Sequence, residues 1–113
     1  MSKELSQSSC EACRLDAPVL SEQEIKELSP QIPSWIVHEE DGIKRLICSF
    51  AFSSYEDSVY FTNKVAELAE QEDHHPEIVL EWGNVTVSWW SHKIKGLHKN
   101  DFICASKTDD LFK

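Results

Sequence analysis

The sequence predicts an α+β domain whose elements follow the order α-β-β-α-β-β-α, with a four-stranded antiparallel sheet and helices packed on one face. Two stretches alternate polar and apolar residues around a tight-turn pair, and three others have helical periodicity. The chain has 113 residues, which is enough for one hydrophobic core but not for two. We therefore expect a single domain over residues 21–113, preceded by a polar tail over residues 1–20.

The first helix is short and is marked at both ends. Ser21 and Glu24 have the spacing of a capping box, and Pro30 prevents the helix from continuing. In the tail before it, Cys10 and Cys13 form a C-x-x-C pair. Zinc would need two more ligands and a redox pair would need a strand before it, so we interpret the two cysteines as a reduced pair.

The first alternating stretch, residues 35–52, predicts a β-hairpin. It turns at Asp41 and Gly42, a pair that readily adopts the positive φ angles of a type I′ turn. His38 falls on the polar side of a strand, where we expect it to be solvated. Alternation after the turn predicts a core-facing set of four: Leu46, Cys48, Phe50 and Phe52.

The second alternating stretch, residues 77–90, predicts another hairpin, with Gly83 and Asn84 as its two turn residues. Alternation places three side chains of its second half on one face: Val85, Val87 and Trp89. Because a hairpin returns its second strand to the start of its first, the residues after the second strand should lie beside those before the first.

Two longer helices are predicted over residues 54–71 and 98–112. Asp101 suits the third position of the second of these helices, where a carboxylate reaches back to a free amide. The first has two alternative capping boxes, Ser53 with Glu56 and Ser54 with Asp57. Its predicted apolar face comprises Tyr55, Val59, Thr62, Ala66 and Ala69, flanked by Phe61, Val65 and Leu68.

Composition and charge exclude several classes of function. The formal net charge is −9 and the isoelectric point about 4.9, so the surface as a whole repels nucleic-acid phosphates. No apolar run approaches the ~20 residues that span a bilayer, and residues 1–8 lack the apolar segment of a secretory signal. We expect a cytoplasmic protein that binds neither membranes nor nucleic acids. Its single cysteines, Cys48 and Cys104, are expected to be buried.

The candidate functional residues gather between the first long helix and the second hairpin: Glu70, Asp73, His74, His75 and Pro76. The hairpin should bring His92 back to them. Imidazoles exchange protons near neutral pH, so acid-base catalysis is one interpretation. Metal binding is another, although adjacent histidines on a regular element point apart. In a third, the histidines only cap the helix and the strand end.

At these residues the chain resembles the pterin-4a-carbinolamine dehydratases, of the bacterial type associated with phenylalanine hydroxylase. The segments that carry the resemblance are Glu70-x-x-Asp73-His74-His75-Pro76-Glu77, Glu81-Trp82-Gly83-x-Val85-Thr86-Val87-x-Trp89-Trp90-Ser91-His92 and Gly96-Leu97-His98-x-Asn100-Asp101-Phe102. The segments around Cys10 and Trp35 resemble the same bacterial group. Where other members place Ser before the last helix, this chain has His98, which we expect to weaken the cap.

The resemblance implies dehydration of 4a-hydroxytetrahydropterin to quinonoid dihydropterin and water, in support of phenylalanine hydroxylase, without a metal or redox cofactor. It implies a homodimer or homotetramer, and an alternative role as a protein-interaction or regulatory module acting on the hydroxylase or its expression. The catalytic residues that it implies are His74, His75 and His92. The substrate-binding residues that it implies are Glu70, Asp73, Trp90, Ser91 and Lys93. Pro76 and Asp101 are assigned structural roles.

Overall fold

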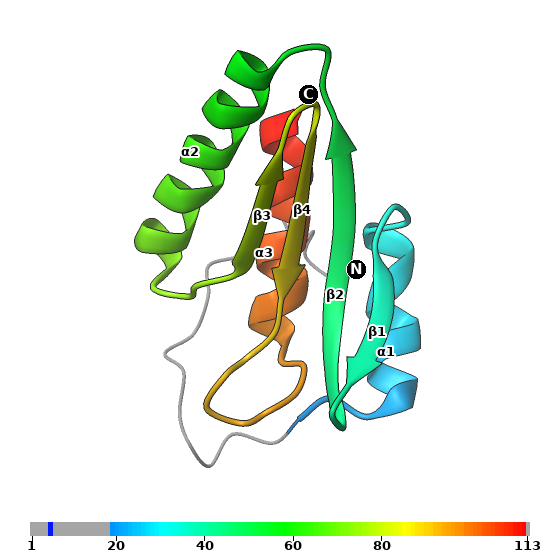
Figure 1. Ribbon diagram of the computed structural model, residues 1–113. Coiled ribbons are helices and arrows are strands. Elements are labelled where there is room, and N and C mark those ends of the chain that lie inside the picture. Colours follow the sequence, from blue (N-terminus) through cyan, green and yellow to red (C-terminus); the bar gives the residue numbers. More distant parts are fainter. Residues whose placement is uncertain (1–4, 6–18, 113) are drawn as a thin grey trace.

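The computed structural model describes Leu5 and residues 19–112 (Figure 1). It confirms the α+β fold and the order of its elements. The helices are α1 (Glu22–Leu28), α2 (Tyr55–Glu72) and α3 (Lys99–Phe112), with a short 3₁₀ helix, η2 (Ser29–Gln31), after α1. The strands are β1 (Ile36–Glu40), β2 (Ile43–Ala51), β3 (Glu77–Glu81) and β4 (Asn84–Trp89).

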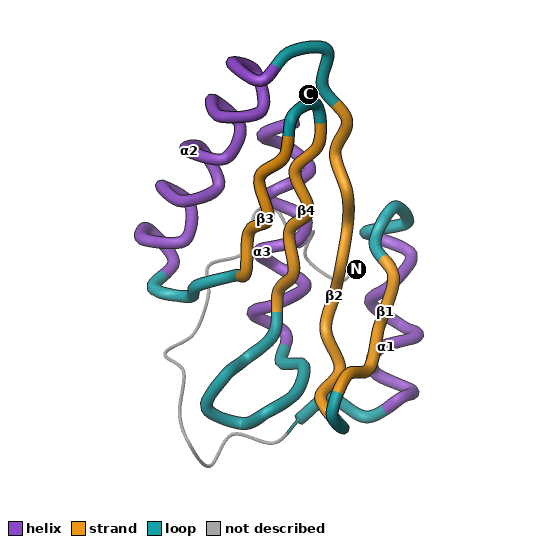
Figure 2. Tube along the Cα trace, in the orientation of Figure 1, coloured by secondary structure: helices purple, strands orange, loops and turns teal. Residues whose placement is uncertain are grey.

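The four strands form one antiparallel sheet in the order β1-β2-β4-β3 (Figure 2). Helices α2 and α3 pack against each other and against the strands, and Figure 1 shows α3 running behind the sheet. The core lies in this layer and includes the predicted sets from both hairpins, with Val85, Val87 and Trp89 fully buried. No helix of the described residues is long and apolar enough to cross a membrane.

The start of α1 is as predicted: Ser21 and Glu24 form a capping box in which each side chain accepts from the other residue's amide. The predicted tail falls mostly outside the described residues, as do Cys10 and Cys13. The described residues of the predicted tail are Leu5, Val19 and Leu20. Leu5 is buried in the core, and its amide donates to Gln31 Oε1 at 3.1 Å.

One hairpin turn matches its prediction and the other is displaced by one residue. Asp41 and Gly42 have φ angles of 54° and 78°, as a type I′ turn requires. In the second hairpin the turn residues are Trp82 and Gly83, whereas Asn84 already belongs to β4. Gly83 has φ 73°, and its carbonyl accepts from the Phe52 amide at 2.9 Å. This bond joins the turn to the residue that follows β2.

The buried face of α2 is rotated from the predicted one. Its buried residues are Ser58, Phe61, Val65, Leu68 and Ala69, whereas Tyr55 and Ala66 are exposed. Ser58 is the buried residue that the prediction left out. It can be fully buried although polar, because its hydroxyl donates to the Ser54 carbonyl at 3.0 Å. Of the two alternative caps, the helix uses Ser54, whose hydroxyl accepts from the Asp57 amide.

Both single cysteines are buried, as predicted. Burial, and then the nearby Asp109 carboxylate, raise the pKa of the Cys48 thiol to about 11. The thiol is therefore protonated at neutral pH, which suits a packing role rather than a nucleophilic one.

We expect Gly83→Ala to lower the free energy of unfolding by about 2 kcal/mol, of which roughly half comes from the positive φ angle. A Cβ atom at this position would also meet the Phe52 carbonyl oxygen at 3.1 Å. Gly42→Ala is the matched control, since Gly42 has φ 78° but open space around it, and it should cost about 1 kcal/mol. Urea unfolding measures both, and equal losses would show that the contact with Phe52 contributes nothing.

Candidate active site

The site begins where α2 ends. Asp73 adopts the left-handed conformation, with φ 51°, and the amides of Asp73 and His74 bond to the carbonyls of Glu70 and Ala69. This pattern is a Schellman motif, which commonly uses glycine at the left-handed position. Pro76 follows and prevents further helix, so the chain leaves as β3. The two adjacent histidines therefore lie in a bent segment between helix and strand, and their rings are free to diverge.

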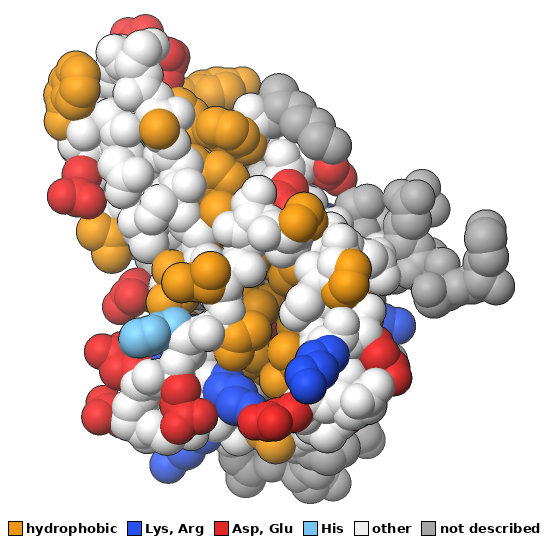
Figure 3. Space-filling model, turned by 90° about the vertical axis from the view of Figure 1, so that its right-hand side faces the viewer, with side chains coloured by type: hydrophobic (Ala, Val, Ile, Leu, Met, Phe, Trp, Pro, Cys, Tyr) orange, Lys and Arg blue, Asp and Glu red, His pale blue; other side chains and the backbone are white. Residues whose placement is uncertain are grey.

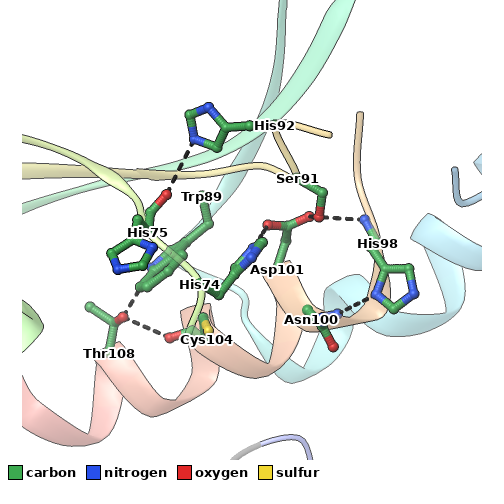
Figure 4. Close-up of polar contacts among 10 residues, drawn as sticks. All are labelled: His74, His75, Trp89, Ser91, His92, His98, Asn100, Asp101, Cys104 and Thr108. Carbon is green, nitrogen blue, oxygen red and sulfur yellow. Dashed lines mark hydrogen bonds and ion pairs between the residues drawn. The ribbon is translucent and has the colours of Figure 1, made fainter. Parts of the chain in front are cut away.

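His74 points inward and is 5% exposed. Its ring is stacked on Trp89, with ring centroids 5.6 Å apart and planes inclined by 8°. The Trp89 indole N–H in turn donates to Thr108 Oγ1 of α3 at 3.1 Å, which fixes the surface on which the imidazole lies (Figure 4). His74 Nε2 is 2.6 Å from Asp101 Oδ1, and that carboxylate is completely buried.

His75 and His92 lie on the solvent side of the same region. The side chain of His75 is 57% exposed, and its Nε2 is 2.8 Å from Glu70 Oε1 of α2. His92 is exposed in the turn that follows β4, and its Nε2 is 3.2 Å from the carbonyl oxygen of His75 (Figure 4). The predicted return of His92 to the histidine pair is therefore confirmed.

The three histidines share one hydrogen-bonding pattern. In each, Nε2 faces an oxygen that can only accept: a carboxylate at His74 and at His75, and a backbone carbonyl at His92. Each acceptor requires Nε2 to carry the hydrogen. Nδ1 is then the nitrogen of each ring that remains to take up or release a proton. One tautomer is thus favoured at all three positions.

Asp101 connects the buried part of the site to the start of α3. Its Oδ2 accepts from the Ser91 hydroxyl at 2.8 Å and from the His98 amide at 2.9 Å. The predicted capping role is present, but the same carboxylate also holds His74. His98 itself caps the helix, because its Nδ1 accepts from the Asn100 amide at 3.1 Å in the place of a serine hydroxyl. The expected weakening of the cap relative to serine stays a prediction.

The other predicted substrate-binding residues lie around this cluster. Trp90 is mostly buried, and its ring centroid is 4.4 Å from that of His92. Ser91 is buried and forms an isolated bridge with Gly96 across the turn that contains His92 and Lys93. Asp73 and Lys93 are exposed. Glu70 is held by His75.

Sequence reasoning missed two contributors. Trp89 was predicted to share one face of its hairpin with Val85 and Val87. Its parallel stacking on His74 was not predicted, because it depends on how a helix end meets a strand. Arg45 was not among the candidate residues, yet its guanidinium carbon lies 4.0 Å from the centroid of the Trp90 ring. No local signal marks Arg45, because its place beside Trp90 depends on how β2 pairs with β4, where Leu46 lies opposite Trp89.

Within the described residues, no group of three or more His, Cys, Asp or Glu side chains is arranged to hold a metal ion. The divergence of His74 and His75 explains this for the histidine cluster: one ring points into the core and the other to solvent. The cluster is built instead as imidazoles paired with acceptor oxygens, an arrangement suited to proton transfer.

Comparison with known proteins points to one family. A family model described as "Pterin 4 alpha carbinolamine dehydratase" matches residues 18–111. A protein of Nitrosococcus oceani is 57% identical over 98% of both chains. A protein of Saccharophagus degradans is 50% identical over 97% of both chains. Both relatives carry the name "Putative pterin-4-alpha-carbinolamine dehydratase".

Solved structures share the fold. A protein of Brucella melitensis, described as a transcriptional coactivator/pterin dehydratase, superposes with a TM-score of 0.76 and 27% identity, over 85% of this chain and 100% of that chain. A pterin dehydratase-like protein, described as a RuBisCO assembly factor in the alpha-carboxysome, has a TM-score of 0.60 and 24% identity, over 70% of this chain and 89% of that chain. The second likeness concerns the fold alone.

Proposed function

Because this chain belongs to the pterin 4 alpha carbinolamine dehydratase family, a family of hydro-lyases, we propose that it dehydrates 4a-hydroxytetrahydropterin to quinonoid dihydropterin. The observation that carries the proposal is the shared pattern of the three histidines. Each imidazole is held through Nε2 by an acceptor oxygen, which leaves Nδ1 for proton exchange.

The reaction needs one acid and one base. A proton delivered to the oxygen on C4a lets that oxygen leave as water, and the C4a–N5 double bond forms as N5 gives its proton to the base. His75 and His92 are the exposed imidazoles, so we propose that they approach the substrate from the solvent side. His74 would approach from beneath, held by Asp101 and supported by Trp89.

The neighbouring polar and aromatic residues would hold the pterin. Trp90 offers the edge of an aromatic surface beside His92, and Asp73 and Lys93 are exposed close to the histidines in sequence. Glu70 would act mainly through His75, and Ser91 through Asp101, because their side chains already bond to those partners. We propose that these five residues form the substrate site or support it directly.

We further propose that no metal or redox cofactor takes part. Loss of water from a carbinolamine changes no oxidation state, and the two proton transfers are within the capacity of imidazoles. Returning the quinonoid product to the tetrahydropterin would take a separate two-electron reduction. The enzyme would therefore support tetrahydropterin recycling for phenylalanine hydroxylase in the cytoplasm.

Association with a second copy is also proposed. Strand β1 is an edge of the sheet, and its exposed residues include Ile36 and Val37. Figure 3 views the molecule from the side of β1 and shows hydrophobic side chains in a band across this face. An exposed apolar edge strand is a suitable surface for pairing with another chain. Light scattering that gives the mass of a monomer at micromolar concentration would contradict this proposal.

A regulatory or interaction role is the second candidate. The Brucella melitensis protein, described as both coactivator and pterin dehydratase, supports it by similarity. The two roles can be separated by a His74/His75 double alanine variant. If that variant still binds phenylalanine hydroxylase or its expression machinery, and the wild type shows no dehydration, the interaction role is the correct one.

The dehydratase proposal is tested with 4a-hydroxytetrahydropterin generated in situ by a phenylalanine hydroxylase reaction. We expect catalytic amounts of the protein to accelerate decay of the absorbance of this intermediate well beyond its spontaneous rate, in proportion to protein concentration. Treatment with EDTA followed by gel filtration should leave the acceleration unchanged. A decay rate equal to that without protein would refute the proposal.

A further inference from the structure

Arg45 of β2 lies at the end of the sheet nearest the histidines. Arg45 immediately precedes Leu46, which pairs with Trp89. Because the two strands are antiparallel, Arg45 faces the position that Trp90 occupies beyond the end of β4. Its side chain is 16% exposed, and its Nη1 is 3.1 Å from Glu40 Oε2 of β1. The guanidinium carbon lies 4.0 Å from the centroid of the Trp90 ring, within the range of a cation–π interaction.

Trp90 in turn contacts His92. The two ring centroids are 4.4 Å apart, with planes inclined by 31°. His92 stands in an exposed turn, where its hydrogen bond to the His75 carbonyl fixes one ring atom but leaves the ring free to rotate about that contact. The indole face restricts this rotation. The row Glu40–Arg45–Trp90–His92 therefore runs from the edge strand to the proposed catalytic group.

The position of the guanidinium lowers the stability of the fold. Arg45 Nε is buried and has no hydrogen-bond partner among the described residues, and a buried unpaired donor is destabilising. An apolar side chain of similar length would cover Trp90 without this cost. What it would lack is the attraction between a cation and the face of the indole, and the flat shape that stacks on it.

We propose that Arg45 is a positioning residue for His92 and that it acts through Trp90. The ion pair with Glu40 holds the guanidinium, the guanidinium holds the plane of the indole, and the indole holds the imidazole in the orientation that proton transfer needs. Small displacements of a reacting group reduce turnover strongly, whereas substrate affinity depends on other contacts. The consequence for turnover rests on the proposed dehydratase function; the placement of His92 does not.

The test compares Arg45→Met, which keeps the length of the side chain but removes its charge, with Arg45→Lys, which keeps the charge. For Arg45→Met we expect kcat to fall about tenfold with KM changed less than twofold. Arg45→Lys should restore part of the loss, because it keeps the charge but not the flat shape. The matched control is Lys64→Met in α2, which removes a cation 5.3 Å from the ring centroid of Tyr60, an exposed residue outside the histidine cluster, and should leave kcat unchanged.

A second readout is independent of activity. The ring resonances of His92, identified by their absence in His92→Gln, should shift in Arg45→Met, shift less in Arg45→Lys and stay unchanged in Lys64→Met. If Arg45→Met does not fold, Glu40→Gln, which releases the guanidinium from its ion pair, should shift the same resonances. Unchanged resonances in a folded variant would overturn the proposal, as would a raised KM at constant kcat, which would mean that Arg45 contacts the substrate itself. A wild type without dehydratase activity would refute the proposed function, while the resonances would still decide the placement of His92.

Discussion

Asp101→Ala is expected to lower the free energy of unfolding by about 3–5 kcal/mol and to abolish most of the proposed dehydratase activity. Asp101 is fully buried, and its two carboxylate oxygens accept from His74, Ser91 and the His98 amide. Alanine would leave all three donors buried or partly buried without an acceptor, and it would remove one cap of α3. Urea unfolding and the dehydration assay measure the two effects.

Two variants separate the structural effect from the catalytic one. Asp101→Asn keeps the size of the side chain, but an amide can donate to His74 Nε2 and so permit the other tautomer. We expect a smaller loss of stability than for alanine, with turnover still reduced on the order of 10²-fold. Asp109→Ala is the control in the same helix: its carboxylate accepts from the Trp35 indole at 2.9 Å, away from the histidines, so stability should fall by about 1 kcal/mol and turnover should be unchanged. Full turnover in Asp101→Asn would show that the tautomer of His74 does not matter.

His92→Ala is expected to reduce kcat at least tenfold, and by 10²–10⁴-fold if His92 is the acid or the base of the rate-limiting proton transfer. The fold should survive, because the side chain lies in an exposed turn and its contacts are to Trp90 and one carbonyl. We expect the free energy of unfolding to change by no more than about 0.5 kcal/mol.

His38→Ala is the matched control, since His38 is an exposed histidine of β1 away from the cluster. It should have wild-type kcat and wild-type stability. Turnover of His92→Ala equal to that of His38→Ala would remove His92 from the mechanism and leave His74 and His75 as the candidates.

Much of this arrangement could be predicted from the order of residues because it depends on local preferences. The Asp41-Gly42 turn, the Ser21–Glu24 capping box and the alternation of the strands each involve residues within a few positions of one another. The return of His92 to the histidine pair followed from hairpin geometry alone, without knowledge of any side-chain contact.

The errors arose where a distant contact decided between local alternatives. Either Trp82-Gly83 or Gly83-Asn84 could have formed the second turn. The structure uses Trp82-Gly83, and the Phe52 amide donates to the Gly83 carbonyl of that turn. The predicted face of α2 left out Ser58, whose hydroxyl is satisfied by a carbonyl of its own helix, so that this polar side chain can be buried.

The sequence by itself determined the residue types of the site and the elements that carry them: carboxylates and imidazoles at a helix end, and a third imidazole after the hairpin that follows. Only the tertiary structure decided their roles. It buried His74 between Trp89 and Asp101, left His75 and His92 at the surface, and brought Arg45 onto Trp90. The physical reason is the sequence distance over which each kind of interaction acts. Turn, cap and strand preferences are set within a few residues, whereas burial and hydrogen-bond partners are set by segments that meet only when the helices pack on the sheet.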